Sequence, residues 1–417
     1  MASFMNISEI KTNKVFCLHP LVTQIKDPLG HVKLCPAKNN FNAQTKDLRL
    51  AWNSEAITEL RRNMLSGCRT DIHCEGCYNL DEQNIPSERT KSLHQVSDEK
   101  IVELLSHIDN EGKMDIDPEY LELSLGIECD SLCAQCNRMS SQKWKDTTKF
   151  LVEAAEHRVI KADLRTRYIF DDSQYTWSDD NMKFWPTFWE VIPNIKHLFL
   201  TGGEPFDSPK MLKLITELSE KEYAGNLKIT INTTGNFIPH NMWDIFKKFK
   251  KTTLLFSIDA VGNKAEWLRY PLKWTNFVDN VKKADELSIY YEFITNVHSL
   301  NLSFIPEIYE WLWSMELNNI PELPIKFTFN HRPSYLDVRF VEQDTKQYIN
   351  QKIWDFYGQY NHKFPEHYFT NLMGCLDFMW QHKDIRRNDL IKEFVLTLDR
   401  VRDTKFNVVF KELDEKL

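Results

Sequence analysis

From Tyr120 onward, strand-like apolar runs alternate with longer stretches of helical periodicity. The expected strands cover residues 120–128, 196–201, 227–233, 252–258, 288–296 and 324–330. The expected helices cover residues 140–159, 208–221, 240–250, 274–287 and 303–317. This alternation predicts a parallel sheet, because each helix returns the chain to the same end of the sheet. There are fewer strand–helix units than a closed (β/α)8 barrel needs, so we predict an α/β fold with an open, TIM-like partial (β/α)6 barrel.

Three cysteines directly follow the first expected strand, Cys129, Cys133 and Cys136, with C-x3-C-x2-C spacing. Soft thiolate ligands at the carboxyl end of a strand are suited to an iron–sulfur cluster. Three thiolates on a four-iron cube leave one iron without a protein ligand, and an open position is typical of a working metal site. A zinc site and three ordinary buried thiols are the alternative interpretations of this spacing.

Polar and glycine residues follow the later strands. The second strand ends in Gly202-Gly203-Glu204, where the glycines allow a ligand to approach the backbone and Glu204 offers a carboxylate to a cationic amine. Asn232 and Ser257 stand at the ends of the third and fourth strands, and Arg269, beyond them, has the right side chain to clamp a carboxylate. Ordinary turns and helix caps are the alternative, because Asn, Ser and Gly are common there.

Five further cysteines lie near the amino terminus: Cys17, Cys35, Cys68, Cys74 and Cys77. Within a loop-rich unit, residues 1–92, Cys17 and Cys35 are expected on the two arms of a hairpin. A Cys74-x-x-Cys77 knuckle with two distant cysteines has the spacing of a four-thiolate metal site, in which Cys68 could replace Cys17 or Cys35. The spacing does not distinguish zinc from a second iron–sulfur cluster.

Charge and hydropathy exclude several classes. The formal net charge of -8 gives no general attraction for nucleic acid or anionic membranes. No apolar run is long enough to span a membrane, and residues 1–14 lack the apolar core of a signal peptide. We therefore expect a cytoplasmic protein whose cysteines are reduced, with Cys375 as a buried thiol. Residues 334–417 show amphipathic helical patterns and predict a C-terminal helical extension.

The order and spacing of these motifs resemble the radical S-adenosylmethionine (radical SAM) enzymes. The resemblance implies that Cys129, Cys133 and Cys136 ligate a catalytic [4Fe–4S] cluster whose fourth iron is chelated by S-adenosylmethionine (SAM). The implied SAM contacts are Gly202, Gly203 and Glu204 to the methionine amine, Arg269 to its carboxylate, and Asn232 and Ser257 to the sulfonium or ribose. One departure is Gln135, where the family usually has an aromatic or bulky apolar residue near adenine.

A narrower resemblance covers the flanking segments. Phe16-Cys17, Cys35, Met64-Leu65-x-Gly67, Cys74-x-x-Cys77, Ser87-x-Arg89, Ser140-Ser141-x-x-Trp144 and Leu398-Asp399-x-x-Arg402-x-x-x-Phe406 are similar to twitch-domain-containing radical SAM proteins of bacteria and phages. Twitch is a half-length auxiliary-cluster module related to SPASM. The resemblance implies that Cys17, Cys35, Cys74 and Cys77 hold an auxiliary iron–sulfur cluster, or zinc. The implied domains are a cysteine-rich twitch/SPASM-like module 1–92, a linker helix 93–115, a radical SAM partial barrel 116–333 and a helical extension 334–417.

The expected activity is reductive cleavage of SAM to a 5′-deoxyadenosyl radical, which abstracts hydrogen from a C–H bond. An auxiliary cluster favours oxidative modification of a peptide, a protein or a small metabolite. The expected partners are a one-electron reductant, such as flavodoxin or ferredoxin, and that substrate. The alternative is a non-catalytic iron–sulfur or zinc protein that binds a partner and retains the fold.

Overall fold

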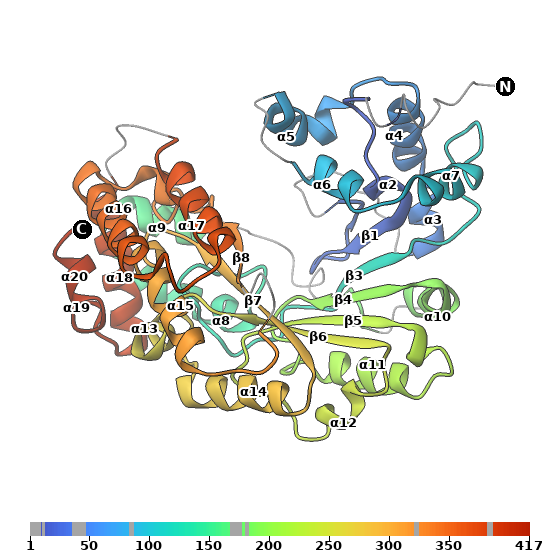
Figure 1. The fold of residues 1–417 in the computed structure, drawn as a ribbon. Helices are drawn as coiled ribbons and strands as arrows, with labels where there is room; N and C mark the ends of the chain where they lie inside the picture. The colour runs from blue at the N-terminus through green and yellow to red at the C-terminus, as the bar shows by residue number, and fades with distance from the viewer. Residues whose placement is uncertain are drawn as a thin grey trace. The chain divides into compact units, whose positions relative to one another are not determined.

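The computed structural model describes residues 10, 13–35, 47–82, 87–166, 177–179, 183–320, 325–381 and 387–417 (Figure 1). The chain divides into two compact units. The first unit comprises Met1–Gly126, Asp171–Gly202 and Glu217–Thr230. The second unit comprises Ile127–Phe170, Gly203–Thr216 and Ile231–Leu417.

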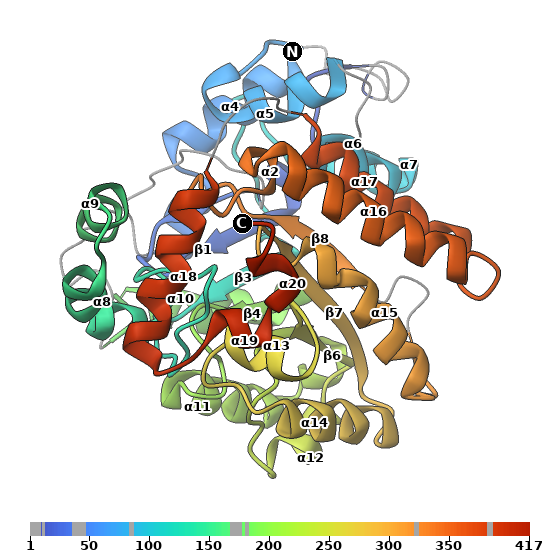
Figure 2. The same ribbon diagram turned by 90° about the vertical axis from the view of Figure 1, so that its left-hand side faces the viewer.

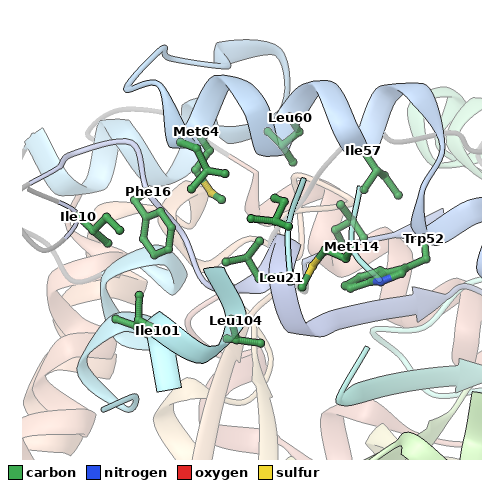
Figure 3. Close-up of a cluster of buried hydrophobic side chains, with 13 residues drawn as sticks. Ile10, Phe16, Leu21, Trp52, Ile57, Leu60, Met64, Ile101, Leu104 and Met114 are labelled. Atoms are coloured by element: carbon green, nitrogen blue, oxygen red, sulfur yellow. The ribbon is translucent and has the colours of Figure 1, made fainter. Parts of the chain in front are cut away.

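The amino-terminal part of the first unit is helical, so the expectation of a loop-rich segment is wrong. Its helices are α2 (His19–Val22), α3 (Leu48–Trp52), α4 (Glu55–Leu65), α5 (Asp71–Glu82), α6 (Glu88–His94) and α7 (Asp98–Ser106). Side-chain capping fixes where α6 and α7 begin. Ser87 forms a capping box with Thr90 at α6, and the Ser97 side chain accepts a hydrogen bond from Lys100 N at α7. These helices bury a shared apolar cluster that includes Phe16, Trp52 and Leu104 (Figure 3).

The predicted metal knuckle is also helical. Cys74 and Cys77 both lie within α5, where a separation of three residues places them on the same side of the helix. A Cys-x-x-Cys pattern alone does not distinguish a loop from a helical turn, because both can bring the two thiols together.

The strands of the first unit follow the order β2-β1-β3-β4-β5. Their bounds are β1 (Thr23–Lys26), β2 (Val32–Lys33), β3 (Tyr120–Ser124), β4 (His197–Thr201) and β5 (Lys228–Thr233), of which β5 continues into the second unit. β1 and β2 form an antiparallel hairpin, but the prediction of Cys17 on its first arm is wrong, because α2 separates Cys17 from β1. β1 also pairs in parallel with β3, which was not expected. β3 and β4 are parallel as well, and α10 (Phe184–Val191) packs against α3 in the same unit.

The strands of the second unit follow the order β5-β6-β7-β8. Here β6 (Lys251–Ser257), β7 (Tyr290–Val297) and β8 (Ile325–Phe329) are parallel neighbours. The helices along the chain are α8 (Gln142–Ala154), α9 (Arg158–Thr166), α11 (Pro209–Ser219), α12 (Met242–Phe246), α13 (Gly262–Leu268), α14 (Trp274–Glu286) and α15 (Ile305–Ser314). All six predicted strands are present, and the α/β prediction with a mostly parallel sheet is confirmed.

The carboxyl-terminal segment is helical, as its periodicity predicts. It contains α16 (Gln343–Tyr360), α17 (Glu366–Met379), α18 (Asn388–Arg402), α19 (Phe406–Val409) and α20 (Lys411–Asp414). Cys375 on α17 is fully buried. α18 packs beside α8 and α9 (Figure 2), and α19 packs against α13. Within the described ranges, no helix combines the length and the apolar character needed to cross a membrane.

Candidate functional site

The cysteine triplet lies in the loop between β3 and α8, and hydrogen bonds hold this loop from several sides. Ser141 Oγ donates to Ser131 O over 2.6 Å while its side chain also caps α8. Trp144 Nε1 donates to Cys133 O over 2.9 Å. Leu132 N donates to Tyr270 O and Ala134 N to Leu268 O, at the end of α13 and just beyond it, both over 2.7 Å. The loop is therefore fixed before any ligand binds.

The three thiols of this loop lie close to one another. Burial raises the pKa of each of Cys129, Cys133 and Cys136 to about 12. Electrostatic repulsion between the thiolates raises these pKa values further. Cys133 raises the pKa of Cys129, Cys136 raises that of Cys133, and Cys129 raises that of Cys136. Buried thiols of this kind ionise only when a metal or a cation stabilises the thiolate. Three converging soft donors in a fixed loop fit an iron–sulfur cluster with one open iron.

The Gly-Gly-Glu turn contacts the backbone just before the triplet. Glu204 N donates to Glu128 O over 2.8 Å, next to Cys129. A Cβ atom at Gly203 would collide with the same Glu128 carbonyl, so this position has no room for a side chain. Gly202 ends the segment Asp171–Gly202 of the first unit. Its φ is 128°, a backbone conformation that residues with a side chain rarely adopt.

Glu204, which follows β4, is a buried carboxylate with an exposed fraction of 4%, and it contacts the carboxyl end of β5. Thr233 Oγ1 donates to its Oε1 over 2.7 Å, and Thr234 N donates to its Oε2 over 2.6 Å. Burial raises the pKa of Glu204 to about 7, although the hydrogen bonds from Thr234 and Thr233 lower it. Among the described residues, no Lys, Arg or His forms an ion pair with this carboxylate, so it is suited to an external cation.

Two further predicted residues meet at the same end of the sheet. Ser257 Oγ donates to Asn232 Oδ1 over 3.1 Å, which joins the ends of β5 and β6. Both groups are fixed by strands, so they form a small polar surface of defined orientation.

Arg269, which the sequence predicts to bind a carboxylate of the ligand, is buried and already pairs with a carboxylate of the protein. Its Nε forms an ion pair with Asp259 Oδ2 at 2.8 Å. Gln135 Nε2 donates to the same carboxylate oxygen, and Asn296 N donates to the other over 3.0 Å. The sequence interpretation does not include Asp259, which stands two residues beyond Ser257.

The amino-terminal cysteines form a second group. Burial raises the pKa of Cys17 to about 12, and the nearby Cys74 and Cys77 raise it further. Burial raises the pKa of Cys74 to about 11, again with a contribution from Cys77. These three thiols are thus brought together within the first unit. Cys35 is half-buried two residues beyond β2, and Cys68 is exposed between α4 and α5.

Comparison with known proteins gives one family match. Residues 188–312 match the model of the Radical SAM superfamily, a segment that includes Glu204, Asn232, Ser257 and Arg269. No curated protein matches the chain.

Several solved structures are similar in part. Native anSMEcpe with bound AdoMet and Cp18Cys peptide is 12% identical with a TM-score of 0.36, covering 58% of this chain and 59% of its own. Streptococcus suis SuiB bound to precursor peptide SuiA is 15% identical with a TM-score of 0.35, covering 78% of this chain and 65% of its own. TYW1 with a lysine-pyruvate adduct bound is 14% identical with a TM-score of 0.32, covering 59% of this chain and 74% of its own. The chain therefore spans less than two thirds of the length of the first two.

Proposed function

We propose that this protein is a radical SAM enzyme whose catalytic [4Fe–4S] cluster is held by Cys129, Cys133 and Cys136. The observation that supports this most directly is the convergence of three buried thiols in a fixed loop whose backbone contacts Gly203 and Glu204. The match of residues 188–312 to the Radical SAM superfamily agrees with it. When bound, the cluster and SAM supply reductive cleavage to methionine and a 5′-deoxyadenosyl radical.

The protein residues have separate roles in this proposal. The Glu204 carboxylate binds the methionine ammonium, because it is buried, oriented by Thr233 and Thr234, and without a cation in the described part of the chain. Gly202 and Gly203 leave the backbone accessible to the amino acid part of SAM. Arg269 holds its carboxylate through the terminal nitrogens, since Nε lies 2.8 Å from Asp259 Oδ2. The Asn232–Ser257 pair offers hydrogen bonds to the ribose or sulfonium.

The finer parts of the proposal concern the first unit and the substrate. Cys17, Cys74 and Cys77, with Cys35, hold a twitch/SPASM-like auxiliary iron–sulfur cluster; zinc is the alternative metal. The domains are those expected above: 1–92, 93–115, the partial barrel 116–333 and 334–417. The enzyme works in the cytoplasm, accepts electrons from flavodoxin or ferredoxin, and oxidatively modifies a peptide, a protein or a small metabolite.

The competing proposal is a metal protein without catalysis that binds a partner. One observation favours considering it: the Cys129 sulfur lies within 4.8 Å of carboxylate oxygens of Asp130 and Asp207, a mixed donor set that can hold an ion other than an iron–sulfur cluster. Such a set does not use Cys133 and Cys136, so the two proposals assign different ligands.

Anaerobic reconstitution with iron and sulfide separates these proposals. We expect the wild-type chain to bind about two cluster equivalents, and to release 5′-deoxyadenosine from SAM when dithionite is added. Cys133→Ser should remove the catalytic cluster and the cleavage. Cys74→Ser should remove only the auxiliary cluster, and Cys375→Ala serves as the control thiol. An iron-free wild-type chain, or one that binds a cluster but leaves SAM intact, would overturn the proposed enzyme.

A further inference from the structure

The last residue of α18 is a buried arginine. Arg402 has an exposed fraction of 5%, and its guanidinium donates only to main-chain carbonyls among the described residues. Nη1 donates to Trp267 O over 3.0 Å, and Nη2 donates to Leu132 O. Nε is buried and has no hydrogen-bond partner among the residues that the structure describes. Leu132 lies directly before Cys133, so the carboxyl-terminal extension reaches into the cysteine loop.

No carboxylate of the described residues forms a salt bridge with this guanidinium, although the negative charge of Asp399 raises its pKa. The nearest acid along the helix, Asp399, is occupied by other donors: Trp267 Nε1 at 2.8 Å, Thr404 Oγ1 at 2.6 Å and Phe406 N at 2.6 Å. Burial lowers the pKa of Arg402 to about 10, so the side chain still carries its charge at neutral pH. A buried charge without a salt bridge is unfavourable, and an anion bound nearby would offset that cost.

In the proposed function, the cysteine loop next to Arg402 holds an anion, the iron–sulfur cluster. A cluster ligated by three thiolates is negatively charged, and its charge becomes more negative when it accepts an electron. Cys133 follows the residue whose carbonyl Arg402 binds, and the positive charge of Arg402 acts on the Cys133 thiol together with that of Arg269. Arg269 already has a carboxylate partner in Asp259, whereas Arg402 forms no salt bridge with any described residue.

We propose that Arg402 is a positioning and charge-compensating residue for the cluster, which fixes the Leu132–Cys133 segment and raises the reduction potential of the bound cluster. A fixed positive charge favours the reduced form because that form carries one more negative charge. Reduction of the cluster would then depend on the carboxyl-terminal helices as well as on the barrel. This inference rests on the proposed function, since it concerns the cluster held by the triplet.

A purely structural role is the competing explanation, in which Arg402 only ties α18 to the loop. Two substitutions separate the roles. Arg402→Lys keeps the charge but cannot reach both carbonyls in the same way, whereas Arg402→Gln keeps an amide donor and removes the charge. Arg400→Gln is the matched control: Arg400 is on the same helix, donates to Ala154 O over 2.8 Å and pairs with Glu393, away from the triplet.

The experiment is a redox titration of the reconstituted full-length proteins without SAM, followed by electron paramagnetic resonance, with iron content and melting temperature measured in parallel. We expect Arg402→Gln to lower the one-electron reduction equilibrium constant of the catalytic cluster at least tenfold, which corresponds to 59 mV. Arg402→Lys and Arg400→Gln should stay near the wild-type potential.

The outcomes are distinct. If the wild-type chain binds no cluster at the triplet, the proposed function itself fails. If Arg402→Gln holds the cluster at the wild-type potential, or if Arg402→Lys shifts it as far as Arg402→Gln does, the charge role is overturned. If Arg402→Gln loses the cluster altogether, the Arg402→Lys variant distinguishes the two roles. A wild-type reduction potential in Arg402→Lys supports the charge role. Loss of the cluster in Arg402→Lys overturns it and supports a purely structural role.

Discussion

Asp259 and Arg269 form an ion pair inside the second unit, with 2.8 Å between Asp259 Oδ2 and Arg269 Nε. Asp259 is fully buried, and Arg269 has an exposed fraction of 9%. Burial alone would lower the pKa of Arg269, but the Asp259 carboxylate, Cys133 and Cys136 raise it above its ordinary value. Asp259 also accepts from Gln135 in the cysteine loop and from Asn296 N at the end of β7. One carboxylate thus connects three parts of the candidate site.

Replacing Asp259 by Asn should destabilise the protein strongly. The substitution leaves the Arg269 charge buried and unpaired, and breaking a buried pair in this way lowers the free energy of unfolding by about 3–5 kcal/mol. Urea denaturation of the ligand-free protein measures the change. Asp279→Asn, at an exposed position of α14, is the control and should change stability by less than about 0.5 kcal/mol. A loss below about 1 kcal/mol in Asp259→Asn would show that the pair contributes little.

The sequence predicted the parallel core of the fold because its strands are strongly apolar and are separated by amphipathic helices. It did not predict β1, which contains Gln24 and Lys26, both fully buried. Their side-chain nitrogens donate to main-chain carbonyls: Gln24 Nε2 to Leu48 O over 2.9 Å, and Lys26 Nζ to Gly30 O over 2.7 Å. Such compensation depends on tertiary contacts, so a polar strand of this kind has no signature in hydrophobic periodicity.

The candidate site was predictable to a different degree. Motif spacing identified Glu204 and the Asn232–Ser257 pair, because these residues stand at strand ends that the fold brings to one edge. The contact between Gln135 and Asp259 joins residues 124 positions apart, and nothing in local sequence predicts it. Gln135 therefore has an identifiable partner where the family resemblance implies an apolar residue.

Gly203→Ala should impair the cysteine loop. The new Cβ would collide with the Glu128 carbonyl, which is main chain and cannot rotate away, so the turn and the hydrogen bond from Glu204 N must shift. We expect at least a tenfold loss of reconstituted catalytic cluster and of 5′-deoxyadenosine formation. The control is Gly358→Ala in α16, where a Cβ meets no atom of the described residues within 4 Å and alanine should stabilise the helix by about 0.5–1 kcal/mol. Wild-type iron content in Gly203→Ala would contradict the steric argument.

Glu204→Gln should weaken SAM binding and change the response of the ligand-free protein to pH. The amide cannot balance the charge of the methionine ammonium, so we expect the dissociation constant of SAM, measured by equilibrium dialysis on the reconstituted protein, to rise at least tenfold. Glu220→Gln, at an exposed position, should bind SAM as the wild type does. Unchanged affinity in Glu204→Gln would remove Glu204 from the SAM site.

The pH effect follows from the raised pKa of Glu204. Its value is about 7 in the folded protein and 4.5 for the ordinary carboxyl, so the folded state binds more protons than the unfolded state between these values. Protonated Glu204 therefore contributes up to about 3 kcal/mol to the free energy of unfolding of the wild type. This contribution is fully present below pH 4.5 and is lost as pH rises through about 7. Urea denaturation from pH 5 to 8 should show this decline in the wild type and its absence in Glu204→Gln. Parallel curves for the two proteins would contradict it.

His298 should make the protein sensitive to acid in the opposite sense. The residue is fully buried after β7; its Nδ1 accepts from Leu300 N over 3.2 Å, and its main-chain N donates to Asn301 Oδ1 over 2.9 Å. Burial lowers the pKa of His298 to about 3, and the positive charge of Arg269 lowers it further. The ring is therefore neutral in the folded protein, with its proton on Nε2 because Nδ1 acts as an acceptor.

Between the ordinary pKa of 6.5 and about 3, the unfolded chain binds a proton at His298 that the folded chain does not. Stability must then fall as pH falls through this window, by at most about 1.4 kcal/mol per pH unit from this residue. His298→Asn keeps an acceptor for Leu300 N and removes the titrating ring. Its free energy of unfolding should be lower than that of the wild type at pH 7, but the gap should narrow steadily as pH is reduced to 4.5. His240→Asn, at an exposed position, should follow the wild-type curve, and a constant gap in His298→Asn would show that the ring titrates alike in both states.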